Sequence, residues 1–203
     1  MRARLFILVI LFSSSSLKAQ DSTKVFRIGF TASLDKNLSS EAMAFDRYTG
    51  FSARYDKFNY RVGLNLEYNL RKGFSLNTAF NYSNKDFTGT YYCAVCNFSV
   101  LPGPEDIDFR LIEVPLSLKY YYQPGRLGVF GEAGVSNHFL LEELTDRTYS
   151  FGIRLGVGLN YNITPDVALR LFYDHTKGIT NLYDESDFRM RTSGFGVGVM
   201  KSL

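Results

Sequence analysis

The sequence predicts an all-β fold: an eight-stranded antiparallel up-and-down β-barrel that spans a membrane. Three observations support this prediction. Apolar and polar residues alternate with a period of two in eight segments of the chain, and the connections between these segments are alternately short and long. Aromatic residues also gather near both ends of the apolar face. An even number of strands of about ten residues, with short turns at one end and long loops at the other, is typical of transmembrane β-barrels.

The chain begins with MRARLFILVILFSSSSLKAQ, in which two arginines precede an unbroken apolar run from Leu5 to Phe12, followed by serines and Ala19. This order predicts a secretory signal peptide over residues 1–19 and a barrel domain over residues 20–203. The apolar run is too short for a membrane-spanning helix, which needs about 20 residues.

Loss of the leader changes the charge balance of the protein. Arg2, Arg4 and Lys18 leave with it, so 20 Lys and Arg remain against 20 Asp and Glu. A formally neutral chain gives no support for a nucleic-acid partner. The remaining length suits one domain.

The alternation is clearest in IEVPLSLKYYYQPGRLGVFGEAGV, where Ile112 and every second residue up to Tyr122 are apolar or aromatic. Glu113 and Lys119 lie on the other face. Proline has no N–H to donate within a paired strand, so we expect a β-bulge at Pro115. The predicted strands are 25–35, 59–70, 74–83, 110–122, 127–136, 149–162, 167–177 and 189–203.

The predicted connections fall into two classes. RKG, QPGR and ITPD are rich in turn-forming residues and join strands tightly, at 71–73, 123–126 and 163–166. The longer connections are 36–58, 84–109, 137–148 and 178–188. We therefore expect turns in the periplasm and loops outside the cell.

Alternation alone leaves open which face points outward, so a soluble lipocalin-like barrel with an apolar interior is the alternative. Two features favour the membrane barrel. Glycines concentrate on the polar face, and a narrow lumen needs small residues. Aromatic residues on the apolar face would form two girdles. They are Phe26, Tyr68, Phe74, Tyr120, Tyr122 and Tyr161 at the inner interface and Tyr60, Tyr82, Tyr149 and Tyr173 at the outer one.

Three stretches carry a resemblance to a known family: IEVPLSLKYYYQPGRLGVFGEAG, SFGIRLGVGLNYNITPDVALRLFYDHTKGITNLYD and SGFGVGVMKSL. They resemble the PorT-like outer-membrane β-barrel family over most of residues 110–203 and more loosely in the N-terminal half. The shared signals are strand patterns rather than catalytic motifs. The resemblance implies a small barrel in the bacterial outer membrane, and some relatives serve in protein secretion or assembly.

Charged residues on the polar face are candidates for a cluster in the lumen. They are Arg27, Arg61, Glu67, Glu113, Lys119, Glu132, Arg154, Arg170 and Asp174. Pairing of residue 35 with 59 would place Arg27 opposite Glu67, and pairing of 136 with 149 would bring Glu132 near Arg154. An eight-stranded barrel fills its interior with side chains, so a neutralising plug is favoured over an ion or solute path.

Cys93 and Cys96 lie in the longest predicted loop, in an oxidising compartment, where we expect a local disulfide. Free thiols and a zinc site with His138 and His175 are the alternatives. A thioredoxin-like redox motif would require a neighbouring βαβ unit, which the sequence does not suggest.

His175 invites comparison with barrel enzymes that modify lipids. Its neighbours do not support this role, because Asp174 points inward and no serine lies two residues away on the same face. Loop 84–109 is rich in aromatic residues and ends in acidic ones, so it could bind a partner or pack over the barrel mouth.

The sequence thus predicts a non-enzymatic protein without a cofactor or metal, with a binding, assembly or secretion-related role through its extracellular loops. It would be a monomer surrounded by outer-membrane lipid, with an extracellular or secretion-system protein as partner. The alternatives are a small-solute or ion channel, an outer-membrane lipid-modifying enzyme and the lipocalin-like barrel.

Overall fold

The computed structural model describes residues 26–203 except 45, 71–72, 98–102, 142–146 and 184–187. The predicted signal peptide, residues 1–19, lies outside the described residues. Within the described ranges, no helix is long and apolar enough to span a membrane.

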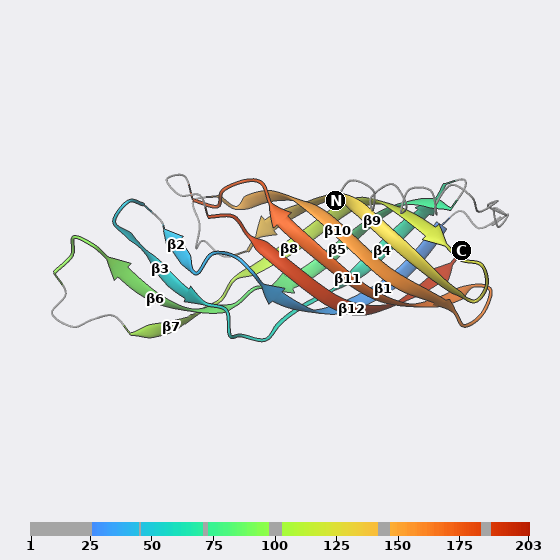
Figure 1. Cartoon of the computed structure of the whole chain (residues 1–203), viewed down its shortest axis with the longest axis horizontal. Coiled ribbons are helices and arrows are strands. Elements are labelled where there is room, and N and C mark those ends of the chain that lie inside the picture. The colour runs from blue at the N-terminus through green and yellow to red at the C-terminus, as the bar shows by residue number, and fades with distance from the viewer. Residues whose placement is uncertain (1–25, 45, 71–72, 98–102, 142–146, 184–187) are drawn as a thin grey trace, which may run out of the picture.

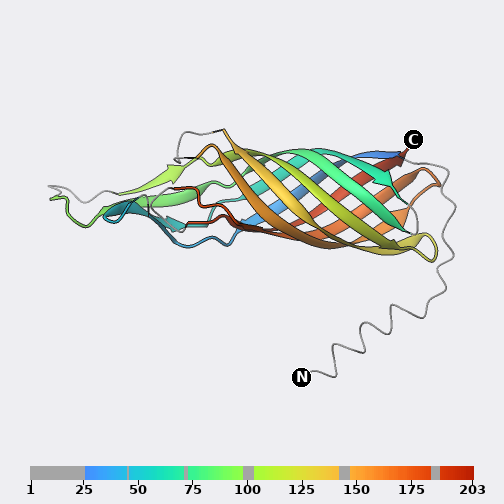
Figure 2. The same ribbon diagram turned by 90° about the horizontal axis from the view of Figure 1, so that it is seen from above.

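Eight strands close into an antiparallel barrel in the order β1-β12-β11-β10-β9-β8-β5-β4, with β4 paired to β1 (Figures 1 and 2). Each barrel strand pairs with the next barrel strand along the chain, and the last, β12, pairs with the first, β1. This confirms the up-and-down topology. The barrel strands are β1 (Phe26–Asn37), β4 (Asn59–Asn69), β5 (Phe74–Asn84), β8 (Arg110–Tyr122), β9 (Leu127–Leu140), β10 (Tyr149–Asn162), β11 (Val167–Gly178) and β12 (Arg191–Ser202).

The strand pairing differs from the sequence prediction at the β9–β10 hairpin. β9 continues to Leu140, four residues past the predicted end, and Ser136 pairs with Gly152 instead of residue 149. The predicted register was therefore wrong by three residues. Alternation continues through Asn137 and Phe139 on the outer face and His138 on the inner face, so the strand has no reason to end at residue 136.

The apolar face points outward. Leu64 and Val157 are 55% and 60% exposed. Asn65 and Glu67, which have the opposite parity to Leu64 on the same strand, are buried in the lumen. A soluble barrel would show the reverse arrangement, so the lipocalin-like alternative is excluded. The close approach of strands on the inner side requires glycine at residue 134, where a Cβ would lie 2.5 Å from the Cα of Ser117.

Pro115 sits in a regular strand, so the predicted β-bulge was wrong. The β5–β8 register is the same on both sides of the proline: Thr78 pairs with Leu116 and Asn81 with Glu113. No residue is inserted. The Thr78 hydroxyl donates a hydrogen bond to the Pro115 carbonyl at 2.9 Å, which helps to hold the strands where the proline cannot donate.

Aromatic side chains lie at both ends of the outer wall. At the end with the short turns, Phe26 contacts Tyr68 and Phe74 contacts Tyr120, with ring centroids 5.0 and 4.9 Å apart. At the loop end, the rings of Tyr60 and Tyr82 are 6.3 Å apart. These positions are those of the two interfacial girdles of an outer-membrane barrel.

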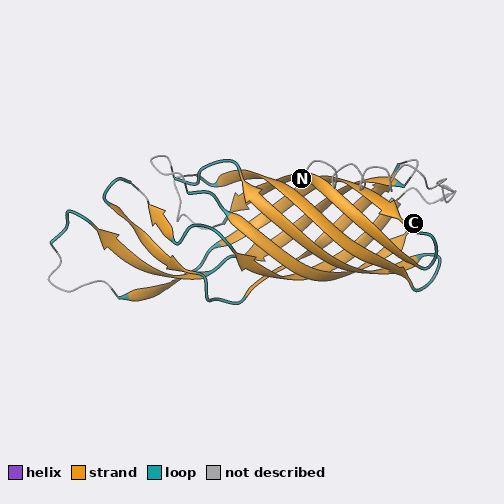
Figure 3. Ribbon diagram, in the orientation of Figure 1, coloured by secondary structure: helices purple, strands orange, loops and turns teal. Residues whose placement is uncertain are grey.

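Two of the predicted loops form a second sheet. Its strands are β2 (Ala42–Ala44), β3 (Thr49–Arg54), β6 (Phe87–Cys93) and β7 (Pro104–Ile107), in the order β2-β3-β6-β7. The sheet projects beyond the barrel at the end away from the short turns and the C-terminus (Figures 1 and 3). Because short turns face the periplasm in such barrels, this extracellular sheet stands outside the cell.

Closure of the barrel leads to a first prediction. The protein extracted without boiling should migrate anomalously in SDS gels and shift after heating, because a closed barrel offers no free strand edge to detergent. A chain truncated before Arg191 lacks β12 and should migrate identically with and without heating. Absence of a heat shift in the full chain, or its recovery in the soluble periplasmic fraction, would contradict the membrane barrel.

A second prediction concerns the outer wall. Leu64→Arg or Val157→Arg places a charge in the hydrocarbon layer and should lower the free energy of unfolding by about 2–4 kcal/mol, measured by urea titration of the folded band. Phe58→Arg, at the outer rim, is the matched control and should cost at most about 1 kcal/mol. Equal effects at all three positions would mean that the wall does not face lipid.

Candidate functional site

The lumen is occupied by a network of ion pairs. At its periplasmic end, the carboxylate of Glu67 lies 3.3 Å from the guanidinium of Arg27 and 2.9 Å from that of Arg170. The Tyr121 hydroxyl also donates a hydrogen bond to Glu67 at 2.7 Å. Lys119 lies 3.8 Å from Glu67 and connects this group to the rest of the network.

The centre of the network is a chain of alternating charges. Glu132 accepts from Lys119 at 3.2 Å and from Arg154 at 3.1 Å. Arg154 donates in turn to Asp174 at 2.7 Å, and Asp174 is also 2.6 Å from Arg61. Each buried charge thus meets at least one opposite charge, which offsets its removal from water.

At the extracellular end, the network includes two residues that the sequence analysis missed. Arg61 pairs with Glu113 at 3.1 Å and lies 3.6 Å from Asp35, and Lys85 contacts both Asp35 and Glu113. The signal was present, because Asp35 and Lys85 both have inward parity. Asp35 is the last residue of one predicted strand, and Lys85 lies two residues beyond the end of another, so neither was included among the predicted lumen residues.

All nine predicted lumen residues lie inside the barrel and belong to this one network. Arg27 is opposite Glu67 in the β1–β4 register, and Glu132 contacts Arg154 diagonally even though the predicted register was wrong. β12 contributes no charge: its inward positions include Gly194, Gly196 and Gly198. A cavity beside Arg61, Lys119 and Glu132 holds about 20 Å³, roughly one water molecule.

An apolar cap closes the extracellular end of the lumen. Phe87, Leu111 and Leu182 are fully buried within it, and the rings of Phe87 and Phe109 are 6.5 Å apart. Its buried members are Ala53, Phe87, Phe109, Leu111, Leu140, Leu182, Tyr183, Phe188 and Met190. Loop 84–109 therefore supplies part of the cap, while β6 and β7 within the same segment extend into the extracellular sheet.

The tip of the extracellular sheet is polar and aromatic. Tyr48 and Tyr92 are 45% and 38% exposed, Val95 is 70% exposed, and the guanidinium of Arg47 lies 5.6 Å from the ring centroid of Tyr48. The backbone N–H of Ala94 donates to the Tyr48 carbonyl at 2.8 Å, which joins the two loops. We call Arg47, Tyr48, Tyr92 and Val95 the tip patch.

Asp46 fixes the turn that leads into the tip patch. Its carboxylate accepts from the Thr49 hydroxyl at 2.7 Å and from the backbone N–H groups of Tyr48 and Thr49. These hydrogen bonds, that of the Thr49 side chain first, lower the pKa of Asp46 below its usual value. Tyr55 directly follows β3. Burial raises the pKa of its hydroxyl, which donates to the Ser40 carbonyl at 2.7 Å.

Cys93 and Cys96 form a disulfide at the end of β6, with their Cα atoms 5.4 Å apart. The two histidines lie elsewhere: His138 is buried in the lumen, 3.1 Å from the Ser150 hydroxyl, and His175 is on the outer wall. The described residues contain no group of His, Cys, Asp or Glu able to hold a metal ion. The arrangement gives no support to the zinc alternative.

His175 has a serine partner that the sequence analysis missed. Ser193 lies opposite it on β12, with its hydroxyl 2.8 Å from Nδ1 of His175. The Nε of Arg191 donates to Nε2 of His175 at 3.3 Å, and the Tyr173 hydroxyl donates to Ser193 at 3.0 Å. A catalytic His–Ser pair would also need a carboxylate to orient the imidazole, but Asp174 points into the lumen toward Arg61 and Arg154.

Solved outer-membrane barrels share this architecture. Neisserial surface protein A (NspA) has 18% sequence identity and a TM-score of 0.53, covering 88% of this chain and 97% of that chain. OprG from Pseudomonas aeruginosa has 15% identity and a TM-score of 0.56, covering 89% of this chain and 97% of that chain. At these identities the likeness shows the fold alone. No curated protein sequence matches the chain.

A sequence-family model identifies the chain independently of the structural likeness. The model described as "Outer membrane protein beta-barrel domain" matches residues 5–200, nearly the whole chain. The match agrees with the closed eight-stranded barrel, its outward apolar face and its aromatic girdles. The chain therefore belongs to the outer membrane protein beta-barrel domain family and is a protein of the bacterial outer membrane.

Proposed function

We propose that this chain is a non-enzymatic binding protein of the PorT-like group, and that its extracellular sheet binds a protein partner in secretion or assembly. The tip patch is the observation that carries the proposal. Tyrosine and arginine are the residue types that dominate binding energy at protein interfaces, and here they stand exposed at the far end of a folded sheet.

The sheet is built in a way that favours binding. Its strands are paired across two loops, with Phe51 opposite Tyr91 and Gly50 opposite Tyr92. The Cys93–Cys96 disulfide and the hydrogen bonds of Asp46 restrain the tip. A restrained surface loses less conformational entropy when a partner binds, so more of the contact energy contributes to affinity.

Transport receives less support from the lumen. Its charges are paired with one another, the cavity beside Arg61 and Glu132 has room for about one water molecule, and the apolar cap covers its extracellular end. A solute would have to break several buried ion pairs to pass. Lipid modification is also disfavoured, because no carboxylate among the described residues contacts the His175 imidazole, and Asp174 is bound to Arg61 and Arg154 instead.

Site-specific photo-crosslinking tests the binding role. A photo-reactive residue in place of Val95 should give discrete protein adducts in intact cells, and Tyr48→Ala with Tyr92→Ala should reduce their yield about tenfold or more. An oxidised peptide of residues 84–109 should compete. The same label at Arg126, in a periplasmic turn, is the control and should not respond to the peptide. Adducts that persist in the double variant, or no adducts at all, would contradict the proposal.

Planar bilayer recordings test the lumen. The purified protein should show no large, steady conductance, because the ion pairs and the cap fill the path. Glu132→Ala removes a partner of both Lys119 and Arg154 and should lower the free energy of unfolding by about 3–5 kcal/mol.

The matched control for this measurement replaces the Lys119–Glu132 pair with two methionines. It should be much less destabilised than Glu132→Ala, because it removes both charges together. Stable open channels in the unmodified protein, with flux that depends on solute size, would place transport ahead of binding.

A further inference from the structure

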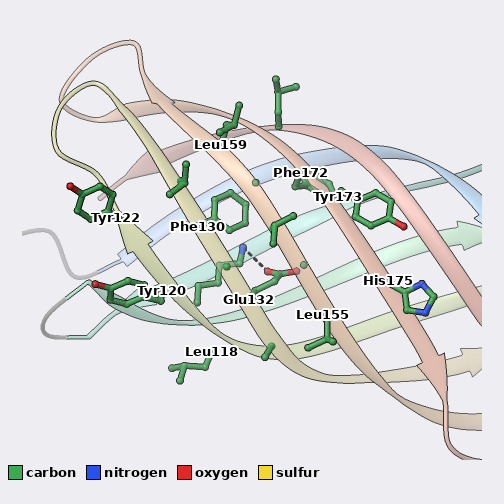
Figure 4. Close-up of a pocket in the computed structure, with 18 of the residues that line it drawn as sticks. Leu118, Tyr120, Tyr122, Phe130, Glu132, Leu155, Leu159, Phe172, Tyr173 and His175 are labelled. Atoms are coloured by element: carbon green, nitrogen blue, oxygen red, sulfur yellow. Dashed lines mark ion pairs between the residues drawn. The ribbon is translucent and has the colours of Figure 1, made fainter. Parts of the chain in front are cut away.

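A groove runs along the outer wall of the barrel between β8 and β11. Its volume is about 1190 Å³. Apolar and aromatic side chains form most of its lining, and the paired Lys119 and Glu132 of the lumen network also border it (Figure 4). Ala133 of β9 lies in it between Leu118 of β8 and Leu155 of β10, and Gly131 lies between Tyr120 and Val157. A Cβ added at Gly131 would meet no atom within 4 Å, so the groove is open there. Such a channel in a lipid-facing wall fits an acyl chain.

The groove leads to a polar cluster at the extracellular interface. His175 lines the extracellular, upper end of the groove, and Figure 4 shows its side chain on the right, across the view from Tyr120 and Tyr122 on the left. One row of cross-strand partners connects the two regions: Ala133 faces Leu155, and Leu155 faces His175. Beyond the groove, the row continues through Ser193 to Lys36 on β1.

Three basic side chains surround this upper end. Lys36, Lys177 and Arg191 are exposed, have outward parity, and lie at the extracellular ends of β1, β11 and β12. Lys177 is directly opposite Arg191, and Lys36 is opposite Ser193. We call these three residues, with His175 and Ser193, the basic patch.

The basic patch differs from the lumen in its charge balance. Every lumen cation has a carboxylate partner, whereas none of the ion pairs between described residues involves Lys36, Lys177 or Arg191. Three adjacent cations at a membrane interface repel one another unless an anion lies between them. Arginine and lysine side chains with a serine hydroxyl are suited to bind phosphate oxygens.

We propose that the basic patch and the groove together bind one phosphorylated lipid of the outer leaflet, with the phosphate on the patch and an acyl chain along Ala133 and Gly131. Both parts of the site lie on paired strands of the barrel. The charged patch is at the extracellular rim and the apolar groove lies below it, which matches the arrangement of headgroup and acyl chain in a lipid. The site lies on the wall and is independent of the tip patch and of the binding role proposed above.

Native mass spectrometry in an uncharged detergent tests the phosphate site, with bis-phosphorylated lipid A as the probe and diacylglycerol as the control lipid without a phosphate. Lys36→Gln, Lys177→Gln and Arg191→Gln should each weaken binding of lipid A about fivefold, and the triple variant about a hundredfold, from about 1 kcal/mol for each basic residue. Lys201→Gln is the matched control, because it removes an outward lysine from the periplasmic end of β12. It should leave the affinity unchanged.

Filling the groove tests the acyl-chain site. Gly131→Leu should weaken lipid A binding about tenfold or more, since its side chain would occupy the space open in the wild type. Ala32→Leu, an outward position on β1 away from the groove, should have no effect. The heat shift in SDS gels verifies that each variant is folded.

Three results would overturn the proposal. The first is equal affinity of the wild type and the folded triple variant for lipid A, and the second is equal binding of diacylglycerol and lipid A. The third is a Gly131→Leu variant that binds lipid A as the wild type does. Should the triple variant fail to fold, the salt dependence of the wild type decides: affinity for lipid A must fall as ionic strength rises, and an unchanged affinity refutes the phosphate site.

Discussion

Compensation of buried charge inside a narrow lumen is the constraint on which the rest of the structure depends. A barrel of eight strands leaves no room for bulk water, so Glu67, Glu132 and Asp174 must each be neutralised by side chains from other strands. These pairs fix the relative height of the strands, since a shift of one residue would turn each charge toward lipid. The outward apolar wall and its groove follow from the same alternation.

The two ends of the lumen are closed in different ways. At the periplasmic end, short turns suffice because Arg27 and Tyr121 complete the contacts of Glu67. At the extracellular end, the long connections bring apolar side chains such as Phe87 and Leu182 over the polar lumen and then extend outward as a sheet. Closure of the lumen and display of the tip patch are therefore two uses of the same loop segments.

The barrel could be predicted from the sequence because period-two alternation is local, and parity alone placed Arg61 and Arg154 in the lumen. Pairings between distant segments could not be predicted. The strands of the extracellular sheet are short and lack clear alternation, and β3 pairs with β6 across the whole of β4 and β5. Ser193 lies beside His175 because of the pairing of β11 with β12, and the two residues are distant in the sequence. The bulge expected at Pro115 does not form: the β5–β8 register continues past the proline, and the Thr78 hydroxyl donates to its carbonyl.

The lumen side of β12 carries no charged side chain. The strands from β1 to β11, with Lys85 beyond β5, carry all the residues of the ion-pair network described here, while β12 presents Gly194, Gly196 and Gly198 to the interior. No ion pair of this network therefore depends on a side chain of β12. Pairing of β12 with β11 and β1 closes the barrel through backbone hydrogen bonds and adds no buried charge to the lumen.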